Sequence, residues 1–173
     1  MSIPSRNSNA SAVASSERTF FVTSSISGRR SLLQSDRSAQ LFPQTLSHYR
    51  DLAKFRLHAF VIMPNHFHVL ITVGQNISIE RAVQFIKGGF AYRAGKELGF
   101  RAPVWQKGFS EVRVLDETSL LRMAEYIHNN PVRRQIVDKP EDFPYSSAFA
   151  GSTVDPMPQR LKPPLLGVSF GAS

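Results

Sequence analysis

The sequence has no cysteine among its 173 residues. That absence excludes disulfide bonds, thiol nucleophiles and cysteine-ligated zinc. Long hydrophobic runs are also missing, since none approaches the roughly 18 apolar residues that cross a bilayer. The Ser- and Asn-rich N-terminal residues contain no hydrophobic signal core. These features lead us to expect a cytoplasmic protein with no membrane partner.

Acidic residues are scarce relative to basic ones. The chain carries 21 Lys and Arg against 13 Asp and Glu, a formal net charge of +8. Nucleic acid is the commonest partner for such a surplus, because Lys and Arg neutralise phosphates whatever the base sequence. The charge alone also fits a basic surface with no such partner. Hydrophobic residues make up 42% of the chain, which is enough for a packed core and excludes a wholly disordered protein.

The length suits one domain with two tails. Residues 1–17 are small and polar without apolar periodicity, and we expect a disordered leader there. Residues 18–150 form the predicted domain. The remaining segment, residues 151–173, is expected to be an extended tail or to lie over the domain, because it contains Pro156, Pro158, Pro163 and Pro164.

Hydrophobic patterns within the domain predict strands that alternate with helices. Strands are expected at 20–23, 56–63, 66–73 and 110–115, and helices at 41–54, 78–98 and 118–130. The first six elements, in the order strand, helix, strand, strand, helix, strand, match the split βαβ pattern. The predicted fold class is therefore α+β, a ferredoxin-like antiparallel sheet with helices on one face and an extra C-terminal helix.

Proline, glycine and capping residues limit the predicted helices. Pro43 fits only in the first turn of its helix. Pro131 is expected to end or kink the last helix. Ser78 can cap the second helix. Gly88 and Gly89 weaken the middle of that helix by about 1 kcal/mol each relative to Ala, and they predict a kink or a close backbone approach.

Two histidines stand two residues apart in a predicted strand. A period of two puts His66 and His68 on one face of the sheet, and it turns Phe67 and the alternate apolar residues towards the helices. Two neutral imidazoles at this spacing can bind one metal ion. The pair alone also fits strand histidines that are satisfied by hydrogen bonds. His58 on the preceding strand is interpreted as structural, or as a residue that orients a ligand.

The last predicted helix carries a polar stripe apart from its apolar face. Arg122, Tyr126 and Asn130 stand at positions i, i+4 and i+8 and so share one side of the helix. The amide oxygen of Asn130 can serve as a third metal ligand beside two histidines. The stripe alone also fits an amphipathic surface helix that stops at Asn-Asn-Pro.

The two segments together indicate phosphodiester chemistry. A tyrosine hydroxyl, with a pKa near about 10, is a poor nucleophile at neutral pH. A metal ion on the scissile phosphate offsets this weakness by stabilising the charge that develops on its oxygens. Two imidazoles and one amide oxygen, with open positions left over, suit Mg²⁺ or Mn²⁺ better than structural zinc. We therefore expect a divalent metal cofactor, Mg²⁺ or Mn²⁺.

At this point the sequence resembles a known family. MPNHFHVL at 63–70 followed by YIHNNPVR at 126–133 resembles the single-tyrosine HUH transposases, and more narrowly the REP-associated tyrosine transposases, relatives of the IS200-type enzymes. Shorter segments extend the resemblance, namely LHAF at 57–60, VWQKGF at 104–109 and PEDFPYSS at 140–147. It runs from about Thr19 to Phe149.

The resemblance implies a ferredoxin-like nuclease fold in which the extra helix is catalytic. His66 and His68 would bind the divalent metal, and Asn130 would complete the site. Tyr126 would attack single-stranded or hairpin DNA, leaving a 5′-phosphotyrosine link and a free 3′-hydroxyl, with repetitive extragenic palindromes as the implied target. The resemblance is compatible with a monomer or a homodimer, and it implies a nucleoid-associated protein in the cytoplasm.

Candidate DNA contacts follow from charge and placement along the chain. Trp105 is a candidate for stacking on an unpaired base, although a tryptophan there also fits the core. The basic candidates lie in loops, on the second helix and beside the catalytic segments: Arg29, Arg30, Lys87, Arg93, Lys96, Lys107, Arg133 and Arg134. Each of them also fits a solvated surface residue.

Three other functions fit parts of the pattern. A domesticated DNA-binding relative without transposition activity would keep the fold, but it would have no reason to keep His66, His68, Tyr126 and Asn130 together. An HUH-type replication initiator or relaxase would be expected to have further domains. A metallohydrolase for small molecules would need neither Tyr126 nor the basic charge. A covalent DNA adduct would separate the first and third from transposase chemistry.

Overall fold

The computed structural model describes residues 17–159 and residue 161. The elements are, in order, β1 (Arg18–Ser25), η1 (Ser27–Arg29), α2 (Asp36–Asp51), β2 (Arg56–Met63), β3 (His66–Val73), α3 (Ile79–Leu98), β4 (Ser110–Val114), α4 (Glu117–Arg133) and η2 (Pro140–Asp142). Strands β2 and β3 coincide with the sequence prediction, whereas β1 extends beyond both ends of the predicted run. Within the described residues, none of the helices is long and apolar enough to span a membrane.

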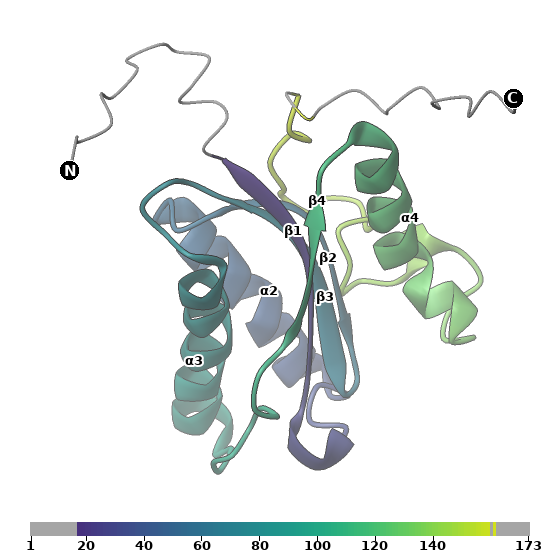
Figure 1. Ribbon diagram of the computed structural model, residues 1–173. Coiled ribbons are helices and arrows are strands. Elements are labelled where there is room, and N and C mark those ends of the chain that lie inside the picture. The colour runs from purple at the N-terminus through teal and green to yellow at the C-terminus, as the bar shows by residue number, and fades with distance from the viewer. Residues whose placement is uncertain (1–16, 160, 162–173) are drawn as a thin grey trace, which may run out of the picture.

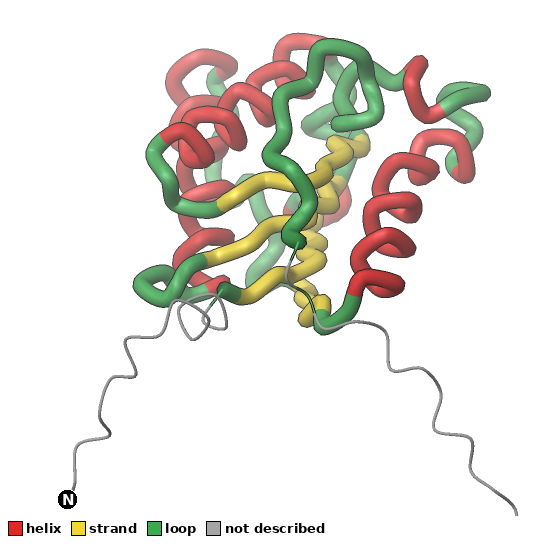
Figure 2. Tube along the Cα trace, turned by 90° about the horizontal axis from the view of Figure 1, so that it is seen from above, coloured by secondary structure: helices red, strands yellow, loops and turns green. Residues whose placement is uncertain are grey.

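The four strands form one antiparallel sheet in the order β2-β3-β1-β4. Helices α2 and α3 lie side by side on one face of the sheet, and α4 lies on the other (Figure 1). Viewed from above, the strands form the middle layer between helices (Figure 2). This arrangement confirms the α+β, ferredoxin-like prediction with its extra C-terminal helix.

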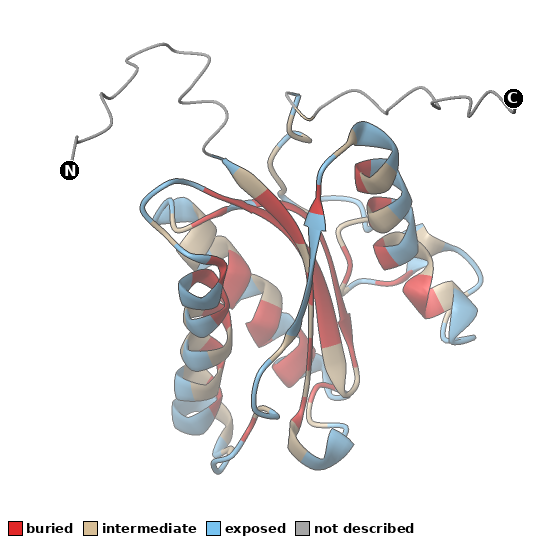
Figure 3. Ribbon diagram, in the orientation of Figure 1, coloured by how far each residue is buried: buried red, intermediate tan, exposed pale blue. Residues whose placement is uncertain are grey.

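The sheet is buried on both faces, so it separates two hydrophobic clusters (Figure 3). On β3, Phe67, Val69 and Ile71 pack towards α2 and α3, as the alternation predicted. Leu70 belongs instead to the cluster beneath α4. Side chains alternate along a strand with a period of two, so His68 faces the α4 side with Leu70.

Helix α2 begins earlier than predicted. Ser35 caps it by accepting a hydrogen bond from the Ser38 amide, so Pro43 is the eighth helical residue and does not lie in the first turn. A proline in a helix interior removes one backbone donor. Burial of Leu41, Phe42 and Leu46 against the core offsets that loss.

Helix α4 likewise continues past its predicted end. Pro131 does not end the helix, which runs on to Arg133. Both Asn130 and Pro131 are buried. The Arg134 amide still donates to the Asn130 carbonyl over 3.1 Å. Tertiary burial thus overrides the local preference of the residue before a proline.

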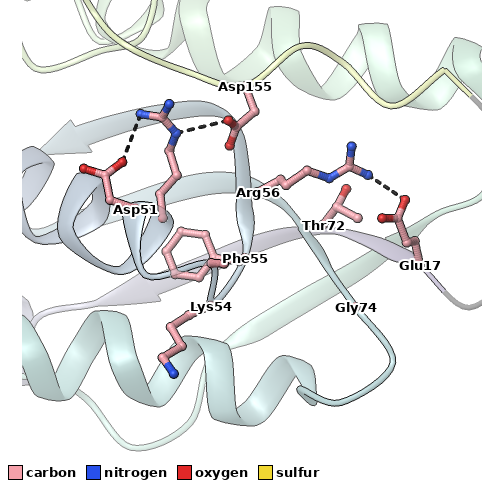
Figure 4. Close-up of a pocket in the computed structure, with 10 residues that line it drawn as sticks. Glu17, Asp51, Lys54, Phe55, Arg56, Thr72, Gly74 and Asp155 are labelled. Atoms are coloured by element: carbon pink, nitrogen blue, oxygen red, sulfur yellow. Dashed lines mark hydrogen bonds and ion pairs between the residues drawn. The ribbon is translucent and has the colours of Figure 1, made fainter.

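The described part of the C-terminal segment lies over the domain. The Asp155 amide donates to the Leu57 carbonyl over 2.7 Å, and the Asp155 carboxylate accepts from the Leu57 amide over 2.8 Å. The same carboxylate pairs with Arg50 of α2 at 3.1 Å, at the rim of a hollow between α2 and the start of β2 (Figure 4). Beyond Asp155, Met157 and Leu161 pack on the cluster beneath α4. This segment therefore ties the edge of the sheet to helices on both faces.

Gly89 marks a close approach between α2 and α3 without a kink in α3. A Cβ atom on Gly89 would lie 2.4 Å from the Tyr49 ring, whereas one on Gly88 would meet nothing within 4 Å. The Tyr49 ring is itself stacked on Phe85, with 5.2 Å between ring centroids. Of the two outcomes expected for the glycine pair, the structure shows the close approach.

Alanine substitutions of Gly88 and Gly89 provide a paired test of how this packing affects stability. Both Gly88→Ala and Gly89→Ala gain helix propensity, worth up to about 1 kcal/mol. We expect Gly88→Ala to raise the free energy of unfolding by about that amount, and Gly89→Ala to lower it by about 1–3 kcal/mol because the Tyr49 ring must move. Urea denaturation of the two variants measures the difference. Equal stabilisation by both would contradict the close packing.

Candidate active site

The histidine pair lies at the start of β3, on the face that α4 covers. The rings of His66 and His68 are 4.9 Å apart between centroids. His68 is 5% exposed and stacks on Phe21 of the neighbouring strand β1 at 5.3 Å, whereas His66 is only partly buried. One buried and one accessible imidazole on the same face leave an approach from solvent to the pair.

Each histidine has a hydrogen-bond partner on its Nδ1 atom. The Asn65 side-chain oxygen lies 2.8 Å from His66 Nδ1, and the Thr23 hydroxyl lies 2.6 Å from His68 Nδ1. The amide oxygen of Asn65 can only accept, so His66 Nδ1 donates to it and Nε2 keeps the lone pair. If the Thr23 hydroxyl also accepts, both Nε2 atoms are free to bind a metal.

Burial keeps both imidazoles neutral near pH 7. Desolvation, aided by the charges of Arg134 and Arg29, lowers the pKa of His66 to about 4. Desolvation also lowers the pKa of His68 to about 3, with further contributions from His66, Arg133 and Arg134. A neutral imidazole can offer a lone pair to a cation, so this electrostatic environment suits metal binding.

Tyr126 of α4 stands against the histidine face. Its ring is 5.5 Å from the His68 ring and 5.8 Å from the Phe21 ring, in edge-on contact with both. The guanidinium of Arg133 lies over the Tyr126 ring at 3.9 Å. Tyr126 is 40% exposed, so its side chain lies at the surface. The rings of Phe21 and His68 hold it in place there.

Asn130 follows Tyr126 by one helical turn and precedes Arg134 by one turn. Its side chain is 1% exposed, and its Oδ1 atom has no hydrogen-bond partner. A buried carbonyl oxygen without a partner is costly, by about 1–3 kcal/mol, unless a ligand satisfies it. Because Tyr126 touches His68 and the charge of Arg134 acts on both histidines, this turn of α4 passes beside the pair.

His66, His68 and Asn130 are the candidate ligands for the metal that the sequence implies. Across residues 17–159 and 161, no group of three or more His, Cys, Asp or Glu side chains could hold a metal ion. A third protein ligand must therefore be an amide or a hydroxyl, and the unpartnered Asn130 oxygen is of the type that Mg²⁺ and Mn²⁺ accept. The donor set is compatible with such a cation.

A separate hydrogen-bond chain fixes α4 on the sheet. His128 Nε2 lies 2.7 Å from the Ser147 hydroxyl, which also accepts from the Phe60 amide of β2 at 3.0 Å. The neighbouring Ser146 is fully buried and bridges to Val61. The segment after α4 therefore holds the tyrosine helix in register with the strands that carry the histidines.

The buried His58 is structural. It is the extra residue of a β-bulge between Leu57 and Ala59. Its ring bonds to the Pro156 carbonyl and to the Thr72 hydroxyl, each at 2.8 Å. Burial lowers the pKa of His58, which fits a neutral ring that links the C-terminal segment to the sheet.

The predicted DNA contacts differ in where the structure places them. Arg29, Arg133 and Arg134 are exposed and lie near the histidines, close enough to act on their pKa values. Arg93 and Lys96 lie on α3, across the sheet from the histidine face (Figure 1). The structure does not bring these two residues to the site.

Other predicted contacts hold loops in place. Arg30 donates to the Ser27 and Pro103 carbonyls. Lys87 donates to the Gln106 and Gly108 carbonyls, and burial lowers its pKa. Trp105 packs among core phenylalanines and donates its indole N–H to the Lys87 carbonyl, so its placement does not support base stacking. Lys107 is exposed in the segment before β4.

The segment that carries the histidine pair and Tyr126 matches a known protein family. The family model described as "Transposase IS200 like" matches residues 19–130. The chain belongs to this IS200-like transposase family. The matched segment contains both histidines, Tyr126 and Asn130.

Curated relatives agree with this family. A Haemophilus influenzae protein with the provisional name REP-associated tyrosine transposase is 29% identical over 116 residues, covering 61% of this chain and 64% of that protein. The chain thus spans less than two thirds of that relative's length. The REP-associated tyrosine transposase of Escherichia coli K12 is 26% identical over 130 residues, 75% of each chain.

Solved structures share the fold. One, a REP-associated tyrosine transposase bound to a REP hairpin, matches 83% of this chain and 92% of its own, with a TM-score of 0.65 and 22% identity. A protein from Deinococcus radiodurans R1, provisionally described as a transposase, matches 75% of this chain and 97% of its own, with a TM-score of 0.50 and 18% identity.

Sequence reasoning missed the residues that support the site. Asn65 falls between two predicted strands and Thr23 lies in a predicted strand, so neither pattern marks a role at the site. The Thr23 contact depends on the pairing of Thr23 with His68 across β1 and β3, and the Asn65 contact depends on a side-chain rotamer; a local pattern reveals neither. Phe21 and His128 were also missed, since their partners are distant in the chain.

The lowered histidine pKa values predict how stability depends on pH. Below an unfolded pKa of about 6.5, the unfolded chain binds protons that folded His66 and His68 reject. Without added metal, the free energy of unfolding should therefore fall as pH drops from about 6.5 towards the folded values of about 4 and about 3.

Urea denaturation at a series of pH values from about 7.5 to about 4 measures this dependence of the free energy of unfolding. A His66→Gln, His68→Gln double variant should lose stability less steeply over this range than the wild type. Parallel curves for the two proteins would show that the histidines are not the source of the slope.

Proposed function

We propose that the protein is a metal-dependent, single-tyrosine enzyme that nicks and rejoins single-stranded DNA. The observation that carries this proposal is the contact of Tyr126 of α4 with His68, which lies beside His66 on β3. The buried, unpartnered oxygen of Asn130, one turn further along α4, supports it. Membership of the IS200-like family supports it, because members of that class are transposases. The proposed substrate is a single strand beside a hairpin of the repetitive extragenic palindromic type, as in the hairpin-bound structural relative.

His66, His68 and Asn130 would hold the cation, Mg²⁺ or Mn²⁺, through two imidazole nitrogens and one amide oxygen. When bound, such a cation supplies Lewis-acid stabilisation of charge on the scissile phosphate. Asn65 and Thr23 orient the two imidazoles through their Nδ1 atoms. The low pKa values keep protons from competing for the Nε2 lone pairs at neutral pH.

Tyr126 is the proposed nucleophile. Its hydroxyl oxygen attacks the phosphorus, the bond from phosphorus to the 3′ oxygen breaks, and the hydroxyl proton ends on the departing 3′ oxygen. The products are a 5′-phosphotyrosine link and a free 3′-hydroxyl, and the reverse attack rejoins a strand. Phe21 and His68 position the ring by edge-on contacts, while Arg133 and Arg134 place positive charge where a phosphate would approach.

A covalent adduct is the direct test of the nucleophile. The full-length protein is incubated with end-labelled hairpin oligonucleotides from the flanks of its own gene and Mg²⁺ or Mn²⁺, then separated in denaturing gel. We expect a DNA–protein band that Tyr126→Phe or EDTA abolishes. Tyr145→Phe is the matched control, because that hydroxyl donates to Asp36 away from the site and its loss should leave the band.

Cleavage without an adduct, or an adduct that survives Tyr126→Phe, would overturn the tyrosine mechanism. Absence of cleavage by the wild type across the native flanking hairpins, with binding retained, would favour a domesticated DNA-binding relative. The two results therefore separate the proposed enzyme from the alternative that keeps only the fold.

The metal site has a test that does not depend on activity. Mn²⁺ should raise the melting temperature of the wild type, because a cation that binds only the folded state stabilises it. Asn130→Leu should leave the metal-free protein as stable or more stable, since it removes a buried unpartnered oxygen. The same variant should lose most of the Mn²⁺-induced increase. An undiminished increase would remove Asn130 from the ligand set.

A further inference from the structure

A groove lies between α2 and α3, on the side of the sheet away from Tyr126 (Figure 1). Its volume is 440 Å³, and its walls are His48 and Tyr49 of α2 and the outer face of α3 from Arg81 to Arg93. None of the site residues lines this groove. The proposed reaction therefore leaves it without a role.

The groove presents aromatic rings to solvent. Tyr92 is 63% exposed, the most exposed of the large hydrophobic and aromatic side chains across the described residues. Tyr49 of the α2 wall stacks on Phe85 of α3 at 5.2 Å. Between these rings, Gly88 leaves the surface of α3 free of a side chain, so a planar group can approach the helix backbone there, whereas the Tyr49 ring covers Gly89.

Positive charge surrounds these rings. Arg81 and Lys54 lie over the Phe85 ring at 4.7 and 5.4 Å, and Lys96 lies over the Tyr92 ring at 4.8 Å. The lining residues include no Asp or Glu. Exposed rings flanked by cations suit a ligand that has both planar apolar groups and regularly spaced negative charges.

We propose that this groove binds a second segment of single-stranded DNA, separate from the strand that reacts at Tyr126. A base would stack on the exposed ring of Tyr92, and phosphates would contact Arg81, Lys54 and Lys96. Only an unpaired strand offers free base faces, whereas a duplex keeps them stacked inside. This inference shares one premise with the proposed function, namely that the protein binds single-stranded DNA.

Substitution of Gly88 tests the groove without threatening the fold. A Cβ at this position meets nothing within 4 Å, so Gly88→Glu adds bulk and negative charge while it improves helix propensity. Thr118→Glu is the control, because it adds the same charge on an exposed turn of α4, across the sheet. Tyr92→Ala removes the exposed stacking ring.

Affinity is measured by fluorescence anisotropy with a labelled 12-nucleotide oligothymidine and the full chain in EDTA, so that no strand is cut. We expect Tyr92→Ala and Gly88→Glu each to weaken binding by about 5- to 100-fold. Thr118→Glu should stay within about twofold of the wild type. Arg81→Gln should reduce the slope of log K against log salt concentration by about 0.7.

Photocrosslinking locates the strand independently of affinity. A single-stranded oligodeoxynucleotide that contains 5-iodo-2′-deoxyuridine should crosslink to the tryptic peptide 88–93, which contains Tyr92, and Gly88→Glu should abolish that crosslink. Unchanged affinity of Gly88→Glu and Tyr92→Ala, with crosslinks confined to peptides that contain His66 or Tyr126, would overturn the proposal. Failure of the covalent-adduct test with these groove effects intact would instead overturn the enzyme and leave the binding site.

Discussion

The pairing of β3 with β1 is the constraint on which the rest of the structure depends. β3 lies between two strands and under helices on both faces, so each of its apolar side chains belongs to one of two clusters. A shift of one residue would exchange those clusters and would move His66 and His68 to the face of α2 and α3. The same pairing sets Thr23 opposite His68, which fixes the orientation of the buried ring. Core packing and site geometry are thus consequences of one register.

The second half of the site is supplied by a helix that no strand hydrogen bond holds. α4 depends on apolar contacts of Leu120, Ala124 and Ile127 with the sheet, and on the bond from His128 to Ser147. Its buried face ends in a polar residue, Asn130, whose side-chain oxygen has no hydrogen-bond partner. An unpartnered buried amide oxygen lowers stability, so this position is where the proposed metal ligand would offset a local cost.

Much of the fold followed from sequence patterns, and the exceptions have physical causes. β2, β3 and α3 were predicted to the residue or within one, because long runs with a clear period fix both face and extent. The start of α2 and the end of α4 were wrong, because they rested on Pro43 and Pro131 and burial outweighed the local proline preference. The shared face of His66 and His68 and the position of Tyr126 on a polar helix stripe followed from their spacing, while their catalytic and metal-binding roles stay predictions. The supporting Asn65 and Thr23 contacts did not follow from spacing, because they depend on tertiary pairing or on a rotamer, and neither can be seen in a local pattern.

The two edges of the sheet differ in a way that bears on aggregation. An open strand edge is a template for pairing with another chain. The β2 edge is covered, because the Ile62 amide donates to Tyr145, the Ser147 amide to Phe60 and the Asp155 amide to Leu57. β4 at the other edge is only five residues long and alternates Glu111 and Arg113 with its apolar residues, features that discourage such pairing. A chain shortened to the family-matched segment would lose the cover on β2 and would expose a long, mostly apolar strand to its neighbours in solution.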